Sequence, residues 1–295
     1  MDWSHDLIDR LAHSVPGGYA ERGEATTEPT ALAGLALVAH SRIAAAQIAA
    51  HWLAEQQADA GSVGISPQRA TPCWPTALAI LLWRAVDRAT GTGTHLRAVD
   101  RAIQWALAER GRIQRRGPLT GHDSTLVGWS WAANTHSWLE PTSMFVLALK
   151  AAGHANHPRT REAVRLIVDR QLPTGGCNYG NTIILDQVLL PHVQPTGLAM
   201  MALADETIDD ARIELSLRYL ERELCRETTT ASLCYGLLGL AAHGCTPPPD
   251  RLVWLRRAYE RVVHRSVNAY KLALLALASS DRYPFGAPVQ GAKNA

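Results

Sequence analysis

The sequence has little of what marks disulfide-rich, nucleic-acid-binding or membrane-spanning proteins. Its 5 cysteines include no Cys-x-x-Cys pair, which is typical of a reducing compartment. The 29 Lys and Arg residues nearly balance the 27 Asp and Glu residues, without blocks of like charge, so no nucleic-acid partner is expected. The N-terminus is too polar for a signal peptide, and no apolar run approaches the roughly 18 residues of a membrane span. We therefore expect a cytoplasmic protein with no transmembrane segment.

Four copies of one short phrase organise the chain: Glu-Pro-Thr-Ala, Trp-Pro-Thr-Ala, Glu-Pro-Thr-Ser and Gln-Pro-Thr-Gly. Their prolines are Pro29, Pro75, Pro141 and Pro195. Each phrase opens an apolar run, and proline suits the first turn of a helix because no N–H is needed there. Aligning the runs by their leucines gives two degenerate copies, at residues 232 and 269. Because the runs are apolar nearly all round, they predict six buried inner helices.

A second set of segments alternates with the inner helices and has charged faces. It covers residues 4–14, 40–57, 95–109, 159–171, 209–223 and 250–264. Apolar residues recur there at helical spacing, which predicts amphipathic outer helices. Six outer and six inner helices predict an all-α (α/α)6 toroid forming one domain over residues 1–295, with a C-terminal tail from about 282. No strand pattern competes with this prediction.

The loops that lead into the inner helices indicate where a site would form. Two are long, at about 111–138 and 172–193. Loops beyond roughly 12–15 residues are uncommon in compact domains and are often functional. Because all inner helices of such a toroid would start at one rim, we expect the site at that rim.

Two segments carry a resemblance to a known family. Gln56–Ser62 (QQADAGS), followed by Trp74–Leu78 (WPTAL), resembles the Q-W repeat of squalene–hopene cyclases and protein prenyltransferase β subunits. Arg170–Gly180 (RQLPTGGCNYG) is a second copy, with cysteine where tryptophan is usual. The resemblance extends over essentially the whole chain and implies a lone-domain terpenoid cyclase-like toroid. That superfamily also includes transferases and non-enzymatic complement-type domains.

The resemblance also implies a catalytic acid. In class II terpene cyclases the proton donor is an aspartate in a D-x-D-D-T-A or D-C-T-A phrase at the start of an inner helix. The matching positions here, two residues before the threonine, are Glu28 and Glu140, and no D-x-D-D occurs. Burial among aromatic rings would raise the pKa of Glu140 and keep it protonated, and His136 could reload the proton. Alternatively, the helix dipole stabilises both carboxylates and lowers their pKa.

Aromatic and polar side chains of the rim are the candidate substrate contacts. The aromatic candidates are Trp74, Trp129, Trp131, Trp138, Tyr179 and Tyr235. Their faces could line a cavity and stabilise a carbocation, or they could brace the outer helices against the loops. The polar candidates are His122, Asp123 and Asn178. These could bind a polar head group or a diphosphate-linked metal, or could simply form turns.

No metal site and no cofactor are expected. Cys234 is separated from His243 and Cys245 by the length of one inner helix, roughly 13 Å, so the three cannot share a metal ion. Mg²⁺ is expected only if the substrate carries a diphosphate group.

Three functions remain open. The leading hypothesis is a cyclase- or isomerase-like enzyme that protonates an alkene of an apolar isoprenoid-type small molecule in a deep aromatic cavity. The first alternative is a non-catalytic toroid that binds a lipid or a protein partner, with its cavity filled by Met144, Phe145, Met200 and Met201. The second is a glycan-processing enzyme with two carboxylates facing each other across an open groove.

Overall fold

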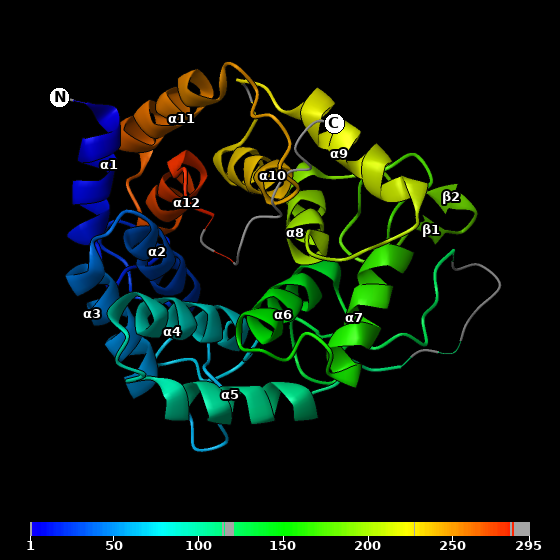
Figure 1. Cartoon of the computed structure of the whole chain (residues 1–295), viewed down its shortest axis with the longest axis horizontal. Helices are drawn as coiled ribbons and strands as arrows, with labels where there is room; N and C mark the ends of the chain where they lie inside the picture. The colour runs from blue at the N-terminus through cyan, green and yellow to red at the C-terminus, as the bar shows by residue number, and fades with distance from the viewer. Residues whose placement is uncertain (1, 114, 116–120, 227, 284, 286–295) are drawn as a thin grey trace.

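The structure is a computed structural model that describes residues 2–113, 115, 121–226, 228–283 and 285. Its helices form two concentric rings (Figure 1). The inner ring consists of α2 (Thr27–Ala39), α4 (Thr76–Thr90), α6 (Leu139–Ala151), α8 (Val193–Leu203), α10 (Thr230–Ala242) and α12 (Ala269–Ser279). The outer ring consists of α1 (Trp3–Ala12), α3 (Ile43–Glu55), α5 (Leu96–Ala108), α7 (Pro158–Asp169), α9 (Ala211–Glu223) and α11 (Arg251–Arg265). The predicted (α/α)6 toroid is confirmed.

The inner helices form a closed ring because each packs against the next and α12 packs against α2. The contact between α8 and α10 is the closest, and glycine makes it possible. A Cβ atom at Gly197 would lie 2.3 Å from the backbone oxygen of Tyr235, and one at Gly239 would lie 2.9 Å from the Cα of Gly197. These two helices therefore lie nearly backbone to backbone, with no room for side chains between them at this level.

The threonine of the repeated phrase fixes each loop above its inner helix. In four units its hydroxyl accepts a hydrogen bond from the backbone N–H of one residue in the preceding loop. The pairs are Thr30 with Gly17 (3.0 Å), Thr76 with Val63 (2.9 Å), Thr142 with Trp129 (3.0 Å) and Thr196 with Cys177 (2.8 Å). We call this contact the threonine clip. It explains why the phrase contains threonine as well as proline.

The ends of the helices follow local chemistry, with one departure from the sequence prediction. Gly153 (φ 87°) follows the end of α6 and Gly244 (φ 68°) follows the end of α10, as glycine does at helix C-termini. The structure adds one small feature that the sequence did not indicate. The second long loop contains a hairpin of β1 (Ile183–Ile184) and β2 (Gln187–Val188). Strands of 2 residues each are too short to give an alternating pattern in the sequence.

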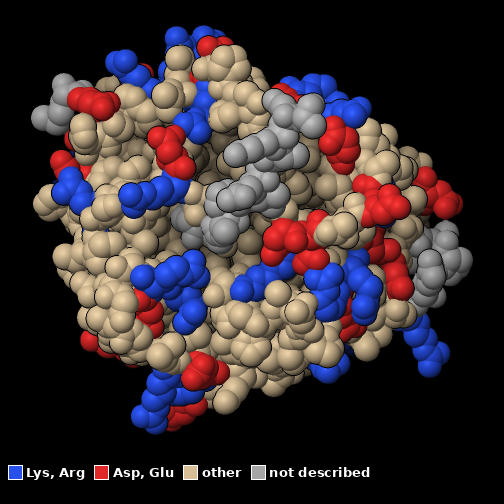
Figure 2. Space-filling model, in the orientation of Figure 1, with Lys and Arg blue, Asp and Glu red and all other residues tan. Residues whose placement is uncertain are grey.

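The surface and the helix lengths agree with the composition. Figure 2 shows acidic and basic side chains interspersed over the visible face of the ring, as a nearly balanced charge would give. Across the residues that the structure describes, no helix is both long and apolar enough to cross a membrane.

Candidate functional site

Two glutamates lie at equivalent positions on one rim. Glu28 is the second residue of α2 and Glu140 is the second residue of α6, with α4 between the two helices. Glu140 is only 5% exposed, and Glu28 is half-buried. The phenol of Tyr19 donates a hydrogen bond to Glu28, and the amide of Gln194 donates to Oε1 of Glu140 over 2.9 Å. Each carboxylate therefore has one neutral hydrogen-bond donor.

Burial decides the protonation of this pair. Desolvation raises the pKa of Glu140 to about 7, although the hydrogen bond from Gln194 acts in the opposite direction. Desolvation also raises the pKa of Glu28 to about 7; the hydrogen bond from Tyr19 lowers it, and the negative charge of Glu140 raises it further. Desolvation thus outweighs the stabilisation that a helix N-terminus gives to a carboxylate. Both carboxyl groups are therefore shifted toward their protonated forms.

Tyrosine side chains surround the two carboxylates. The ring centroids of Tyr19 and Tyr270 lie 5.2 Å apart, and those of Tyr179 and His192 lie 5.1 Å apart. Burial raises the pKa of Tyr235 well above its usual value, and the charges of both glutamates add to this effect. Tyr235 is 2% exposed, and its hydroxyl has no hydrogen-bond partner among the described residues. The site therefore contains neutral donors beside a pair of acids.

Two of the tryptophans predicted to contact a substrate lie together in a pocket. Trp74 and Trp131 meet edge to face, with ring centroids 4.7 Å apart, and line a pocket of about 410 Å³ together with Trp105 and Trp129. Trp74 occupies the position of Glu28 and Glu140 in the second phrase. This tryptophan pocket therefore adjoins the rim on which the carboxylates lie.

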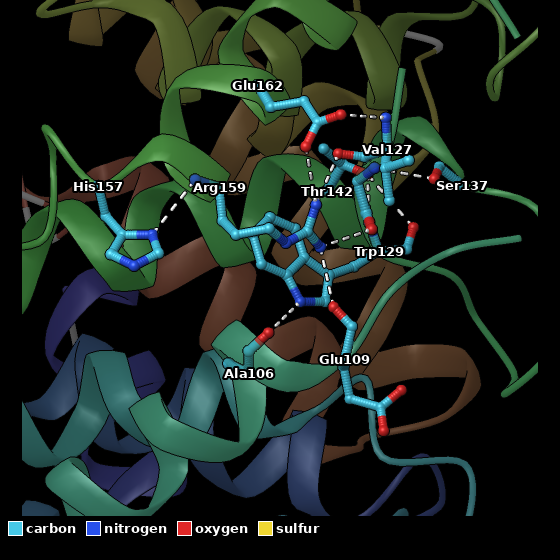
Figure 3. A network of polar contacts seen from close by, with 10 residues as sticks. Ala106, Glu109, Val127, Trp129, Ser137, Thr142, His157, Arg159 and Glu162 are labelled. Carbon is cyan, nitrogen blue, oxygen red and sulfur yellow. Dashed lines mark hydrogen bonds and ion pairs between the residues drawn. The ribbon is translucent and has the colours of Figure 1, made fainter. Parts of the chain in front are cut away.

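Trp129 is held by a network of polar contacts in the wall of the ring (Figure 3). Its indole N–H donates to the oxygen of Ala106 over 2.9 Å, and its backbone N–H donates to Thr142 over 3.0 Å. The guanidinium of Arg159 lies 4.6 Å from the ring centroid. The ring is only 2% exposed. Trp129 therefore holds its loop against α5, α6 and α7.

The predicted histidines lie together in a second pocket. His122 and His136 both line a cavity of about 280 Å³, and the ring of His136 lies 4.5 Å from that of Trp138. The hydrogen bond to Glu140 comes from Gln194 and not from His136. We call this cavity the histidine pocket.

Asp123 and Asn178 make hydrogen bonds within the loops. The Asp123 carboxylate accepts from the backbone N–H of Thr125 over 2.9 Å. The amide of Asn178 donates to the oxygen of Leu190 over 2.7 Å and accepts from the N–H of Tyr179 over 2.8 Å. These are the contacts of turn-forming residues.

The side chains proposed to fill the cavity of a non-catalytic toroid are all buried. Met144, Phe145, Met200 and Met201 are at most 3% exposed. Phe145 lies against Trp129 and Trp105 at ring distances of 4.9 and 6.2 Å. It therefore fills the space between α6 and the outer helix α5.

Sequence reasoning missed three residues of the site. Gln194 occupies the position of Glu28 and Glu140 in the fourth phrase, so the repeat itself carried the signal. Tyr19 follows a Gly-Gly pair in the first loop, and Tyr270 replaces the threonine in the sixth copy. Nothing local in the sequence indicates that these two tyrosines meet.

Comparison with known proteins supports the fold. No protein-family model and no curated protein sequence matches the chain. Similar solved structures include the type II terpene cyclase MstE from Scytonema, with 11% identity, a TM-score of 0.60 and coverage of 96% of this chain and 99% of that one. A glycosidase has 12% identity and a TM-score of 0.60, with coverage of 93% and 96%. An α-amylase from Clostridium perfringens has 8% identity and a TM-score of 0.62, with coverage of 96% and 97%. At such identities the likeness shows the toroid alone.

Proposed function

We propose that this protein is an enzyme that cleaves glycosidic bonds, with Glu28 and Glu140 as its two carboxylates. One observation carries the proposal. Two glutamates at equivalent positions of one rim each have a pKa of about 7, and the charge of one raises the pKa of the other. At neutral pH such a pair supplies one carboxylic acid and one carboxylate, which is the pair that glycoside cleavage requires.

We assign the roles of the two glutamates by their exposure. Glu140 has the smaller exposed fraction and is assigned as the general acid. Each carboxylate accepts a hydrogen bond that favours its ionised form, from Tyr19 to Glu28 and from Gln194 to Glu140. Glu140 gives its proton to the glycosidic oxygen as the bond from that oxygen to the anomeric carbon breaks. Glu28 either deprotonates the water that attacks that carbon, or bonds to the carbon itself as the leaving group departs. In the second route, water deprotonated by the Glu140 carboxylate then breaks the bond between Glu28 and the sugar, and the stereochemistry of the product distinguishes the two routes.

The strength of the acid favours this reaction over protonation of an alkene. An acid is most effective when its pKa lies near the operating pH, and a pKa of about 7 suits transfer to an oxygen leaving group at neutral pH. The half-buried rings of Trp74 and Trp131 can stack on the apolar face of a sugar ring.

A second function is favoured by the aromatic surroundings of Glu140. Tyr179, Tyr235 and Trp74 would stabilise a carbocation if Glu140 protonated an isoprenoid alkene. A carboxylic acid with a pKa of about 7 is weak for this step, which is why we place it second.

The test uses the full chain and two sets of substrates. Aryl glycosides and oligosaccharides are analysed for released sugar, and squalene, farnesyl diphosphate and geranylgeranyl diphosphate are analysed by gas chromatography–mass spectrometry with and without Mg²⁺. Glu140→Gln and Glu28→Gln should each lower the rate by about 10²–10⁴-fold. The matched control is Glu55→Gln, at the exposed end of α3. Released sugar that depends on both glutamates supports glycoside cleavage. A cyclised hydrocarbon that depends on Glu140 alone supports the second function, and no turnover in either set overturns both.

A further inference from the structure

The histidine pocket is lined by side chains that donate hydrogen bonds. Its polar lining consists of Arg112, His122, Ser124, His136, Ser137, Arg170 and Asn181. No carboxylate is among the described residues that line it. A cavity of about 280 Å³ with this lining suits a ligand that accepts hydrogen bonds.

Two of these side chains are buried and incompletely satisfied. His122 is 7% exposed, and its Nδ1 has no hydrogen-bond partner among the described residues. Arg170 is 3% exposed, and its Nε likewise has no partner there. Both residues line the cavity, where a ligand that accepts hydrogen bonds would add to the partners of their side chains.

The charges around the pocket favour an anion. Arg170 contacts the carboxylate of Asp169 and donates to the backbone oxygen of Asp123 over 3.3 Å, so its charge is partly compensated. Arg112 lies at the exposed side of the lining. The hydroxyl of Ser137 accepts from the N–H of Gly128 over 2.9 Å, which leaves its hydrogen able to donate. The lining therefore combines the charges of two arginines with neutral donors.

The pocket lies near the start of α6, the helix that carries Glu140. Gly180 lines it, and a Cβ atom at Gly180 would lie 3.6 Å from the backbone nitrogen of Leu139. That nitrogen donates to the oxygen of Tyr179 over 3.0 Å, and Glu140 is the next residue along the chain. The pocket and Glu140 are therefore on the same side of the ring, although the Glu140 side chain is not among the described residues that line the pocket.

We propose that the histidine pocket binds an anionic oxygen group, a phosphate or a carboxylate, through Arg112, His122, His136 and Arg170. The assignment of this group to the substrate rests on the proposed function, because it makes the substrate an acidic glycan. The binding itself does not depend on catalysis.

The test measures binding directly, by isothermal titration calorimetry and by the NMR signals of the histidine rings. The probes are inorganic phosphate and glucuronate. Arg112→Gln should weaken binding by at least about tenfold, since it removes one charge-assisted hydrogen bond. Arg115→Gln is the matched control, because it removes the same charge from an exposed position three residues away that does not line the pocket. The signals of His122 and His136 should shift on titration in the wild type.

Each outcome decides the proposal. Tighter binding of phosphate or of glucuronate supports it and identifies the kind of anion. No binding of either probe at about 10 mM would overturn it, as would equal weakening by Arg112→Gln and Arg115→Gln. The same titration with Glu140→Gln separates the two proposals, because a failure of catalysis leaves anion binding intact.

Discussion

Altering a buried polar residue usually destabilises a protein. Replacing Glu140 with glutamine should instead stabilise this one, but only at high pH. Burial raises the pKa of the Glu140 carboxyl from its ordinary value of 4.5 to about 7 in the folded protein. The folded state therefore binds this proton more tightly than the unfolded state does. The stability that the protonated group contributes is fully present below pH 4.5 and is lost as the pH rises through 7.

The size of the effect follows from the two pKa values. One pKa unit corresponds to about 1.4 kcal/mol, so ionisation of Glu140 at pH 8 costs about 3 kcal/mol. Glutamine has the shape of the protonated acid and cannot ionise. Glu140→Gln should therefore raise the free energy of unfolding by up to about 3 kcal/mol at pH 8, with a midpoint of thermal unfolding about 5 °C higher. The difference from the wild type should be close to zero at pH 4.5.

The assay is urea unfolding followed by circular dichroism at pH 4.5, 6 and 8. Glu28 still titrates in the variant, and loss of the Glu140 charge lowers its pKa, which adds to the stabilisation of the variant at pH 8. Glu55→Gln, at an exposed position, should follow the wild type at all three pH values. An unchanged or lowered stability of Glu140→Gln at pH 8 would refute the reasoning. A stabilisation of the same size at every pH would show that shape and not charge is responsible.

Three further predictions concern the clip, the site and the ring. Thr142→Val leaves the backbone N–H of Trp129 buried without its acceptor and should lower the free energy of unfolding by about 2 kcal/mol in urea unfolding. Tyr19→Phe removes the hydrogen bond that lowers the pKa of Glu28, so the pH–rate profile should move to higher pH at the step that Glu28 controls. Gly197→Ala places a Cβ atom 2.3 Å from a backbone oxygen of α10 and should destabilise the protein by about 1–3 kcal/mol in the same unfolding assay.

Matched variants test the specificity of these effects. Thr174→Val changes an exposed threonine and should leave the stability unchanged. Tyr259→Phe also removes a phenol–carboxylate hydrogen bond, to Asp6 on α1, but should not move the pH–rate profile. Gly23→Ala meets its nearest atom at 3.1 Å and should cost less than Gly197→Ala. If a control matches its partner variant, the reason given for that partner is wrong.

The helices were predictable because their signals are local. A proline followed by a run of leucine and alanine identifies an inner helix wherever it occurs, and charged periodic segments identify the outer ones. The carboxylate pair was not predictable as a pair. Glu28 and Glu140 belong to the first and third units, and only closure of the ring determines that the charge of one reaches the other. Tyr19 meets Tyr270 for the same reason, because α12 packs against α2.

The threonine clips have a consequence for how such a protein can change. In the first three units the clipped residue precedes its threonine by 13 positions, whereas Cys177 precedes Thr196 by 19. The fourth loop contains the β1–β2 hairpin within this longer span, and its hydrogen bond is still 2.8 Å long. An insertion between the loop residue and the threonine of a clip therefore leaves the inner helix that follows the loop in place. The rim can gain or lose loop segments one unit at a time, so its ligand preference can diverge while the barrel of helices that carries it stays the same.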